Sequence, residues 1–212
     1  MSVQRIDSID RAVETLLKAF HKCPSNNFLN SKFCDVPLEA PQEDPELADE
    51  LTKGVIMYYY NHDAEIVQAG DYDAVAIWTV PGKPVPVDRT KDAKFNEIFI
   101  DQSQRMKEQV IPKGMPYYYL FMIGKDLKSG KRGAVRAIFE KYIARAEAEG
   151  AALVLEAIAE HAREVYEYFG FRTYLTMNYG RGEVDSDGNV DPNGEGHKAY
   201  LMIYLPASKA KL

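Results

Sequence analysis

Apolar side chains recur along this chain in two kinds of pattern. Residues 8–21 carry Ile9, Val13, Leu16 and Phe20 on one face of a predicted helix, because these positions repeat at helical spacing. Further helices are predicted over residues 46–60, 92–110, 130–149 and 161–169. Runs rich in β-branched and aromatic residues predict strands over residues 3–6, 64–68, 74–80, 117–125, 151–157, 171–179 and 198–205.

The order of these elements predicts the fold class. A strand and two helices precede an antiparallel meander, and a further helix leads into strand–helix–strand–helix–strand–strand. The strand–helix–strand unit over residues 117–157 requires two parallel neighbours joined by a right-handed crossover. We therefore expect an α/β fold, with a mixed central sheet, an antiparallel N-terminal meander, a parallel pair of strands at the centre and helices on both faces.

Two segments fall outside the predicted elements. Residues 22–45 hold four prolines together with Asn and Asp, so we expect a loop of unusual length there, and long loops are often functional. Residues 180–197 are rich in Gly and Asp and predict a hairpin insertion between the last two strands. The acidic run within this insertion, residues 185–191, lacks the spacing of a calcium-binding loop.

Length and composition place the chain among ordinary globular proteins. Its 212 residues are 46% hydrophobic and 27% charged, which suits a single domain over residues 1–212. The net charge of −6 argues against a nucleic-acid partner, and no apolar run approaches the ~20 residues of a membrane helix. The two cysteines and four histidines show no metal-binding spacing, so we expect no metal and a reducing, cytoplasmic location.

The segment over residues 123–135 is the strongest candidate for a phosphate-binding turn. It leaves a predicted strand and opens a helix, whose N-terminus offers free N–H groups and a positive dipole end. Gly130 and Gly133 allow a ligand to approach the backbone, and Lys131 and Arg132 add positive charge to an acidic chain. The segment fits neither the P-loop nor the dinucleotide-binding pattern. A plain turn with solvated lysines is the simpler alternative.

Three motifs resemble those of the GNAT superfamily of acetyl-CoA-dependent N-acyltransferases, and in the order and spacing of its elements the resemblance covers roughly residues 3–205. Residues 130–135 (GKRGAV) are similar to motif A, Gln/Arg-x-x-Gly-x-Gly/Ala, with Gly133 as its central glycine. Residues 165–171 (VYEYFGF) resemble the Tyr-x-x-x-Gly-Phe signature, and residues 74–81 (AVAIWTVP) are similar to a meander strand of puromycin-type N-acetyltransferases. Two positions depart from motif A, since Gly130 replaces Gln/Arg and Val135 replaces Gly/Ala.

The resemblance implies a function and a set of site residues. It implies transfer of an acetyl group from acetyl-CoA to a primary amine of a small molecule, by direct attack in a ternary complex. The backbone of Ile123 and Lys125 is then expected to bind the pantetheine arm, although the family normally has an apolar residue where Lys125 stands. Tyr166 matches the family's general acid, and a packed core tyrosine is the alternative. The pyrophosphate is expected to lie on the turn formed by Gly130, Lys131, Arg132, Gly133, Ala134 and Val135.

Glu156 is a candidate site residue on the sequence pattern alone, without the family resemblance. It is a carboxylate inside the apolar run LVLEAI of residues 153–158. Burying a charge is costly unless the group is paired or takes up a proton. Glu156 is therefore a candidate general base for an ammonium substrate, either directly or through water. A strand-end carboxylate that pairs with an arginine or faces water is an equal alternative, and His161 is a second candidate base.

The acceptor side of the site is defined less sharply. Trp78, Phe28 and Tyr118 are candidate substrate-binding residues, with the segment 22–45 as a loop on the acceptor side, and core packing is the alternative for these rings. Two other functions stay open. One is a GNAT-fold module that binds CoA with weak or no turnover, and the other is an unrelated nucleotide binder that uses the turn over residues 130–136. We expect a monomer or a homodimer.

Overall fold

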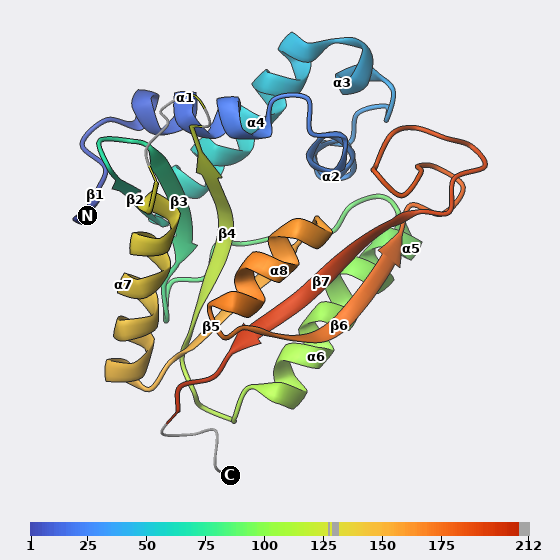
Figure 1. Cartoon of the computed structure of the whole chain (residues 1–212). Helices are drawn as coiled ribbons and strands as arrows, with labels where there is room; N and C mark the ends of the chain where they lie inside the picture. Colours follow the sequence, from blue (N-terminus) through green and yellow to red (C-terminus); the bar gives the residue numbers. More distant parts are fainter. Residues whose placement is uncertain (127, 129–131, 208–212) are drawn as a thin grey trace.

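A mixed seven-stranded sheet organises the part of the chain that the computed structural model describes, namely residues 1–126, 128 and 132–207 (Figure 1). The strands are Val3–Arg5 (β1), Glu65–Ala69 (β2), Ala74–Thr79 (β3), Tyr117–Lys125 (β4), Ala152–Ala157 (β5), Arg172–Tyr179 (β6) and His197–Tyr204 (β7). They lie in the order β1-β2-β3-β4-β5-β7-β6, and all neighbours are antiparallel except β4 and β5. The predicted meander and central parallel pair are confirmed.

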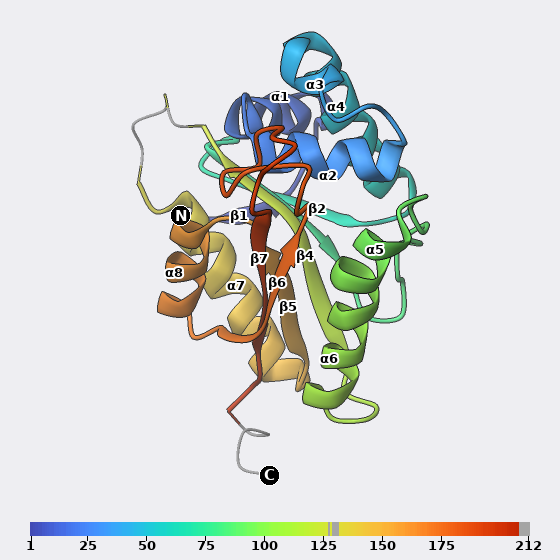
Figure 2. The ribbon, with the colours of Figure 1, turned by 90° about the vertical axis from the view of Figure 1, so that its right-hand side faces the viewer.

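Helices cover both faces of this sheet, as the order of elements predicted. They are Ile9–Phe20 (α1), Pro24–Cys34 (α2), Ala40–Glu43 (α3), Pro45–Asn61 (α4), Ala93–Phe95 (α5), Gln102–Val110 (α6), Ala134–Glu149 (α7) and Glu160–Tyr168 (α8). A π-helix, Asn96–Asp101 (η1), lies between α5 and α6. Figure 2 shows α7 and α8 on one side of the sheet and α5 and α6 on the other. Helices α1 and α4 share a second hydrophobic cluster with β2 and β3.

The segment over residues 22–45 is largely helical, which corrects the prediction of a loop. Helix α2 begins at Pro24, whose fixed φ angle suits the first turn of a helix. Its buried face is polar, because Asn26 and Asn30 both donate hydrogen bonds of 3.0 Å to the Thr52 hydroxyl on α4. A search for apolar periodicity misses a helix of this kind.

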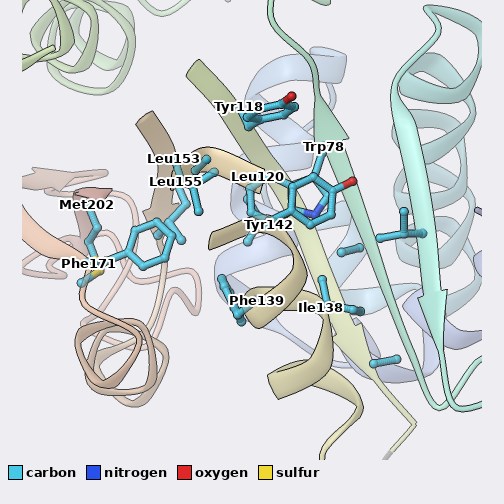
Figure 3. Close-up of a cluster of buried hydrophobic side chains, with 14 of the residues drawn as sticks. Trp78, Tyr118, Leu120, Ile138, Phe139, Tyr142, Leu153, Leu155, Phe171 and Met202 are labelled. Atoms are coloured by element: carbon cyan, nitrogen blue, oxygen red, sulfur yellow. The ribbon is translucent and has the colours of Figure 1, made fainter. Parts of the chain in front are cut away.

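The largest buried rings lie between the sheet and α7. Trp78 of β3 stacks on Tyr142 of α7, with ring centroids 4.1 Å apart and planes 10° apart. Phe139 packs edge-on against Trp78 (Figure 3). Because Trp78 and Tyr142 are fully buried, this packing fixes α7 against the central strands and sets where the N-terminus of α7 lies.

The parallel strands β4 and β5 separate part-way along their length. Their pairing ends at Leu120 and Leu155. β4 continues to Lys125 alongside β3, and β5 continues to Ala157 alongside β7. We call the space between these two strand ends the β4–β5 gap. In Figure 1 the end of β4 rises toward α1, away from β7.

A β-bulge lies where the separation begins. Ile77 pairs with Met122 and Trp78 pairs with Leu120, so that Phe121 is an extra residue on β4. A bulge bends its strand and increases the local twist. The bulge at Phe121 therefore accounts for the direction that the end of β4 takes, away from β5.

Candidate active site

The end of β4 presents unpaired backbone groups to the β4–β5 gap. The N–H of Asp126 donates to the carbonyl oxygen of Asp73, on the β3 side, at 2.9 Å. Because backbone groups of successive residues in an antiparallel pair point alternately toward and away from the partner strand, those of Ile123 and Lys125 point toward the gap. These are the two residues whose backbone the sequence predicted to bind a cofactor.

The N-terminus of α7 supplies further free N–H groups. Gly133 is the N-cap residue, and its φ angle of +96° lies in the left-handed region that favours glycine. The first helical hydrogen bond runs from the N–H of Ala137 to the carbonyl oxygen of Gly133. The N–H groups of Ala134, Val135 and Arg136 precede that bond and so have no partner within the helix.

A cleft of about 580 Å³ joins the end of β4 to α7 and α8. Five of the residues predicted to bind the cofactor line it, namely Lys125, Arg132, Gly133, Ala134 and Val135. Gly130 and Lys131, which belong to the same prediction, lie outside the described residues. Ile123 packs against the core beneath α7. Apart from the two residues outside the described ranges, the predicted cofactor residues therefore lie in one place.

The cleft is positively charged where it meets α7. Lys125, Arg132 and Arg136 line it, and Glu164 of α8 is the acidic residue among the described lining. Cationic side chains next to a helix N-terminus are the arrangement that binds phosphate groups. Val135 also lines the cleft.

Tyr166 lies on α8 beside this cleft. Its neighbours Val165 and Phe169 line the cleft, and its ring packs against Phe139 and Phe171. Burial raises the pKa of Tyr166 to about 12, so the phenol keeps its proton at neutral pH. The ring is therefore packed in the core, and it carries a protonated hydroxyl as well.

Glu156 lies on the opposite face of the sheet. It is the first β5 residue beyond the last β4–β5 pair, and its neighbours Leu155 and Ala157 belong to the core beneath α7. Ser103 of α6 donates to Glu156 Oε1 at 2.7 Å. The other oxygen, Oε2, is buried and accepts no hydrogen bond of normal geometry from the described residues.

Two phenols lie close to this carboxylate. Burial raises the pKa of Tyr119 on β4 well above its usual range, and the charge of Glu156 raises it further. Burial and the same charge also raise the pKa of Tyr59 on α4. Tyr59 stacks on the bulge residue Phe121, with ring centroids 3.7 Å apart. A carboxylate, two phenols and the Ser103 hydroxyl thus converge from four elements beside the β4–β5 gap.

The three aromatic residues predicted to bind an acceptor are buried in the core, which corrects those predictions. Trp78 is fully buried against Tyr142, and Tyr118 is 1% exposed on the same face of the sheet (Figure 3). Phe28 of α2 is also 1% exposed and stacks on Tyr179 at 5.5 Å. Core packing, which the sequence left open for each ring, is what the structure shows for all three.

Sequence reasoning missed Ser103 and Tyr59 and selected Tyr118 where Tyr119 shares a face with the carboxylate. Alternation along a strand sends consecutive residues to opposite faces. Tyr119 pairs with Val154, which lies two residues before Glu156 and therefore on its side of the sheet. That register decides which tyrosine approaches Glu156, and no spacing within the sequence reveals it.

Two kinds of site are absent from residues 1–126, 128 and 132–207. Within these ranges, no group of three or more His, Cys, Asp or Glu side chains is placed to hold a metal ion. No helix in the same ranges is long and apolar enough to cross a membrane.

Known proteins are similar to this chain in sequence and in fold. The family model of the YOR012W acetyltransferase domain matches residues 4–84. The Saccharomyces cerevisiae protein YDR391C is 50% identical over 195 residues, which cover 92% of this chain and 82% of that protein.

Solved structures agree at the level of the fold. A structure of histone acetyltransferase HPA2 and related acetyltransferase from Corynebacterium glutamicum has a TM-score of 0.56 at 22% identity, covering 97% of this chain and 96% of that one. The C-terminal condensation domain of Ebony, in complex with beta-alanyl-dopamine, has a TM-score of 0.60 at 14% identity, covering 96% and 98%. The chain belongs to the family of the Saccharomyces cerevisiae proteins YDR391C and YOR012W, the second of which gives its name to the matching acetyltransferase domain, and its fold is that of the GNAT acetyltransferases.

Proposed function

We propose that this protein transfers an acetyl group from acetyl-CoA to a primary amine of a small molecule, by direct attack within a ternary complex. The observation that carries the proposal is the β4–β5 gap. A positively charged cleft opens on its α7–α8 side, and a buried carboxylate, Glu156, lies on the other face of the sheet. A thioester and an amine that enter from opposite faces meet at such a gap in a fixed geometry.

The cleft suits the chemistry of coenzyme A. Free N–H groups at the start of α7, together with Arg132 and Arg136, match a pyrophosphate. The backbone groups of Ile123 and Lys125 match the amides of a pantetheine arm, because an extended chain can add to an unpaired strand edge. When bound, acetyl-CoA supplies the activated acetyl group. Val135, which is larger than the Gly/Ala of the family pattern, lines this cleft.

Glu156 and Tyr166 are assigned the two proton transfers. An ammonium group must lose a proton before its nitrogen can attack a thioester, and Glu156 Oε2 accepts no hydrogen bond of normal geometry from the described residues. The sulfur that leaves as the C–S bond breaks needs a proton. The Tyr166 phenol holds one at neutral pH because its pKa is raised to about 12. One proton of the ammonium group thus goes to Glu156, directly or through water, and the proton of Tyr166 goes to sulfur as the C–S bond breaks. The second nitrogen proton, released as the amide forms, restores the Tyr166 phenol through water.

The acceptor is assigned as a small amine that arrives as a cation. A carboxylate attracts an ammonium group, and the aromatic rings of Tyr59 and Tyr119 beside Glu156 add cation–π attraction. The beta-alanyl-dopamine in the Ebony structure is a small amine conjugate bound by a protein of this fold. The net charge of −6 acts in the same direction.

The first test is the melting temperature with millimolar acetyl-CoA, CoA or ATP against no ligand. A ligand at a hundred times its Kd stabilises by about 2.7 kcal/mol, which gives a clear shift. We expect shifts with both CoA species and little with ATP. CoA release from acetyl-CoA is then measured with 2-phenylethylamine, dopamine, spermidine and a peptide that has a free N-terminus. Release that is faster with a small amine than with the peptide supports the proposal.

A CoA-binding module with weak or no turnover is the second candidate. The observation that favours it is Val135, which stands in the cleft where the family pattern has a smaller residue. A thermal shift with CoA but no release with any of the four acceptors selects this candidate. No shift with either CoA species contradicts both candidates.

A further inference from the structure

The segment between β3 and β4 contributes a residue to the acceptor face of the sheet. It contains α5, η1 and α6, and it packs on the face opposite α7 (Figure 2). Ser103, in the first turn of α6, is 2% exposed, and its hydroxyl donates a hydrogen bond of 2.7 Å across to Glu156 Oε1. These two residues are 53 positions apart in the sequence.

The π-helix immediately before α6 sets the direction of Ser103. A π-helix adds a residue to its turn, so the residues that follow are rotated by about 100° relative to a continuous α-helix. Its first residue, Asn96, is 4% exposed and is anchored to Thr90. The Asn96 amide donates to the Thr90 carbonyl at 2.7 Å and accepts from the Thr90 N–H and hydroxyl, both at 2.9 Å. Single turns of this kind occur often at functional sites.

The hydrogen bond from Ser103 makes the two oxygens of Glu156 unequal. Oε1 is occupied, whereas Oε2 is buried and without a hydrogen bond of normal geometry from the described residues. A carboxylate with one fixed oxygen cannot rotate freely, so its other oxygen keeps one direction. A proton acceptor that is held in one direction needs no reorganisation when the amine arrives.

We propose that Ser103 is a positioning residue for Glu156, and that it holds the carboxylate so that Oε2 accepts the proton of the amine. The inference rests on the proposed function and adds to it the segment between β3 and β4. Ser103 touches neither reactant and acts only through Glu156. Turnover therefore depends on the π-helix, which orients Ser103. This π-helix lies outside the cofactor cleft and outside the three motifs that resemble those of the GNAT superfamily.

The test is a double-mutant cycle with Ser103→Ala and Glu156→Gln, using the fastest of the four acceptors named above. We expect Ser103→Ala to lower kcat about tenfold, the worth of one hydrogen bond to a charged group. The KM for acetyl-CoA and the melting shift with CoA should stay unchanged, because the cleft lies on the other face. In the Glu156→Gln background, Ser103→Ala should have no further effect beyond about twofold, since the two residues act as a unit.

Ser31→Ala is the matched control variant. Ser31 lies in α2, is 1% exposed, and its hydroxyl has no hydrogen-bond partner among the described residues. Its substitution should leave kcat at the wild-type value. If Ser103→Ala lowers kcat equally in both backgrounds, Ser103 has a structural role alone and the proposal is overturned.

The remaining outcomes separate this inference from the proposed function. Wild-type kcat in Ser103→Ala, together with a large loss in Glu156→Gln, overturns the inference and leaves the proposed function standing. Wild-type kcat in Glu156→Gln overturns the assignment of the base, and the inference fails with it. No turnover of any of the four acceptors by the wild-type chain overturns both.

Discussion

The fold surrounds two carboxylates of its sheet, Glu65 and Glu156, in opposite ways. Glu65 opens β2 and is 8% exposed. Its Oε1 accepts hydrogen bonds from the Tyr142 hydroxyl at 2.5 Å and from Arg145 at 2.8 Å, and its Oε2 accepts one from Arg5 at 2.7 Å. Each of its oxygens is thus occupied, and two of the three donors are cations.

The two oxygens of Glu156 are not both occupied by hydrogen-bond donors in this way. One oxygen is held by Ser103, and the other is buried with no hydrogen bond of normal geometry from the described residues. A buried polar atom without a partner costs stability and calls for an explanation, and at Glu156 the adjoining β4–β5 gap supplies one. Occupied oxygens thus mark a carboxylate that holds the structure together, and a buried oxygen left without a partner beside a gap marks one that is available for chemistry.

The largest expected effect is on turnover in Glu156→Gln. General-base catalysis is worth about a hundred- to ten-thousandfold, so we expect kcat to fall about a thousandfold with the best small amine. The unfolding midpoint should stay near that of the wild type, because an amide still accepts the hydrogen bond from Ser103. Steady-state release of CoA and a urea titration measure the two quantities. If Glu65→Gln lowers kcat by a similar factor in folded protein, the distinction between the two carboxylates is wrong.

The next effect is on stability and comes from the other carboxylate. Glu65→Ala leaves Arg145 and Arg5 without their shared partner and leaves the Tyr142 hydroxyl buried without an acceptor. Removing one member of a buried charge network costs about 3 kcal/mol, discounted here because Arg5 is well exposed. We expect the free energy of unfolding to fall by that amount, with an unchanged urea m-value and wild-type kcat per folded molecule. A loss below about 0.5 kcal/mol would contradict the structural role.

The sequence predicted one of these carboxylates and not the other. Glu156 was visible because it interrupts the apolar run over residues 153–158, whereas Glu65 sits at a strand start where a charge is ordinary. The partners of Glu65 lie on β1 and α7, and Ser103 of the Glu156 site lies in a polar helix. Their proximity follows from strand register and helix packing, which one sequence does not encode in any local pattern.

Local sequence patterns predicted the fold, whereas parts of the site depend on contacts between elements that are distant in the sequence. Strand–helix order and apolar runs are local signals, and they predicted the sheet, its parallel pair and the turn at Gly133. The polar buried face of α2 and the choice of Tyr119 over Tyr118 depend on contacts with distant elements. Local signals also could not show whether the rings of Trp78 and Phe28 are buried in the core, as they are, or line a pocket.

The phenols of Tyr142 and Tyr166 differ in the same way as the two carboxylates, and smaller changes in kcat and stability are expected from them. Tyr142 donates to Glu65, whereas no hydrogen bond is seen for the Tyr166 phenol within the described part of the chain. We expect Tyr166→Phe to lower kcat about thirtyfold at unchanged CoA affinity, as loss of a general acid would. We expect Tyr142→Phe to lower the free energy of unfolding by about 1 kcal/mol at unchanged kcat. CoA release assays and urea titrations on both variants check this, and the reverse assignment of the two effects would contradict it.

The smallest effect is the dependence of stability on pH. Burial alone raises the pKa of Glu65, but the hydrogen bonds from Tyr142 and Arg5 and the charge of Arg145 outweigh it, and the pKa is lowered from its ordinary 4.5. A carboxyl group with a lower pKa in the folded state stabilises the fold fully above its unfolded pKa, and this stabilisation is lost as the pH falls through the folded pKa. We therefore expect the stability difference between wild type and Glu65→Gln to be constant near neutral pH and to shrink below about pH 4.5. Urea titrations of both proteins from about pH 7 to about pH 3 measure it, and a difference that stays constant throughout would show that Glu65 is not held as an ionised group.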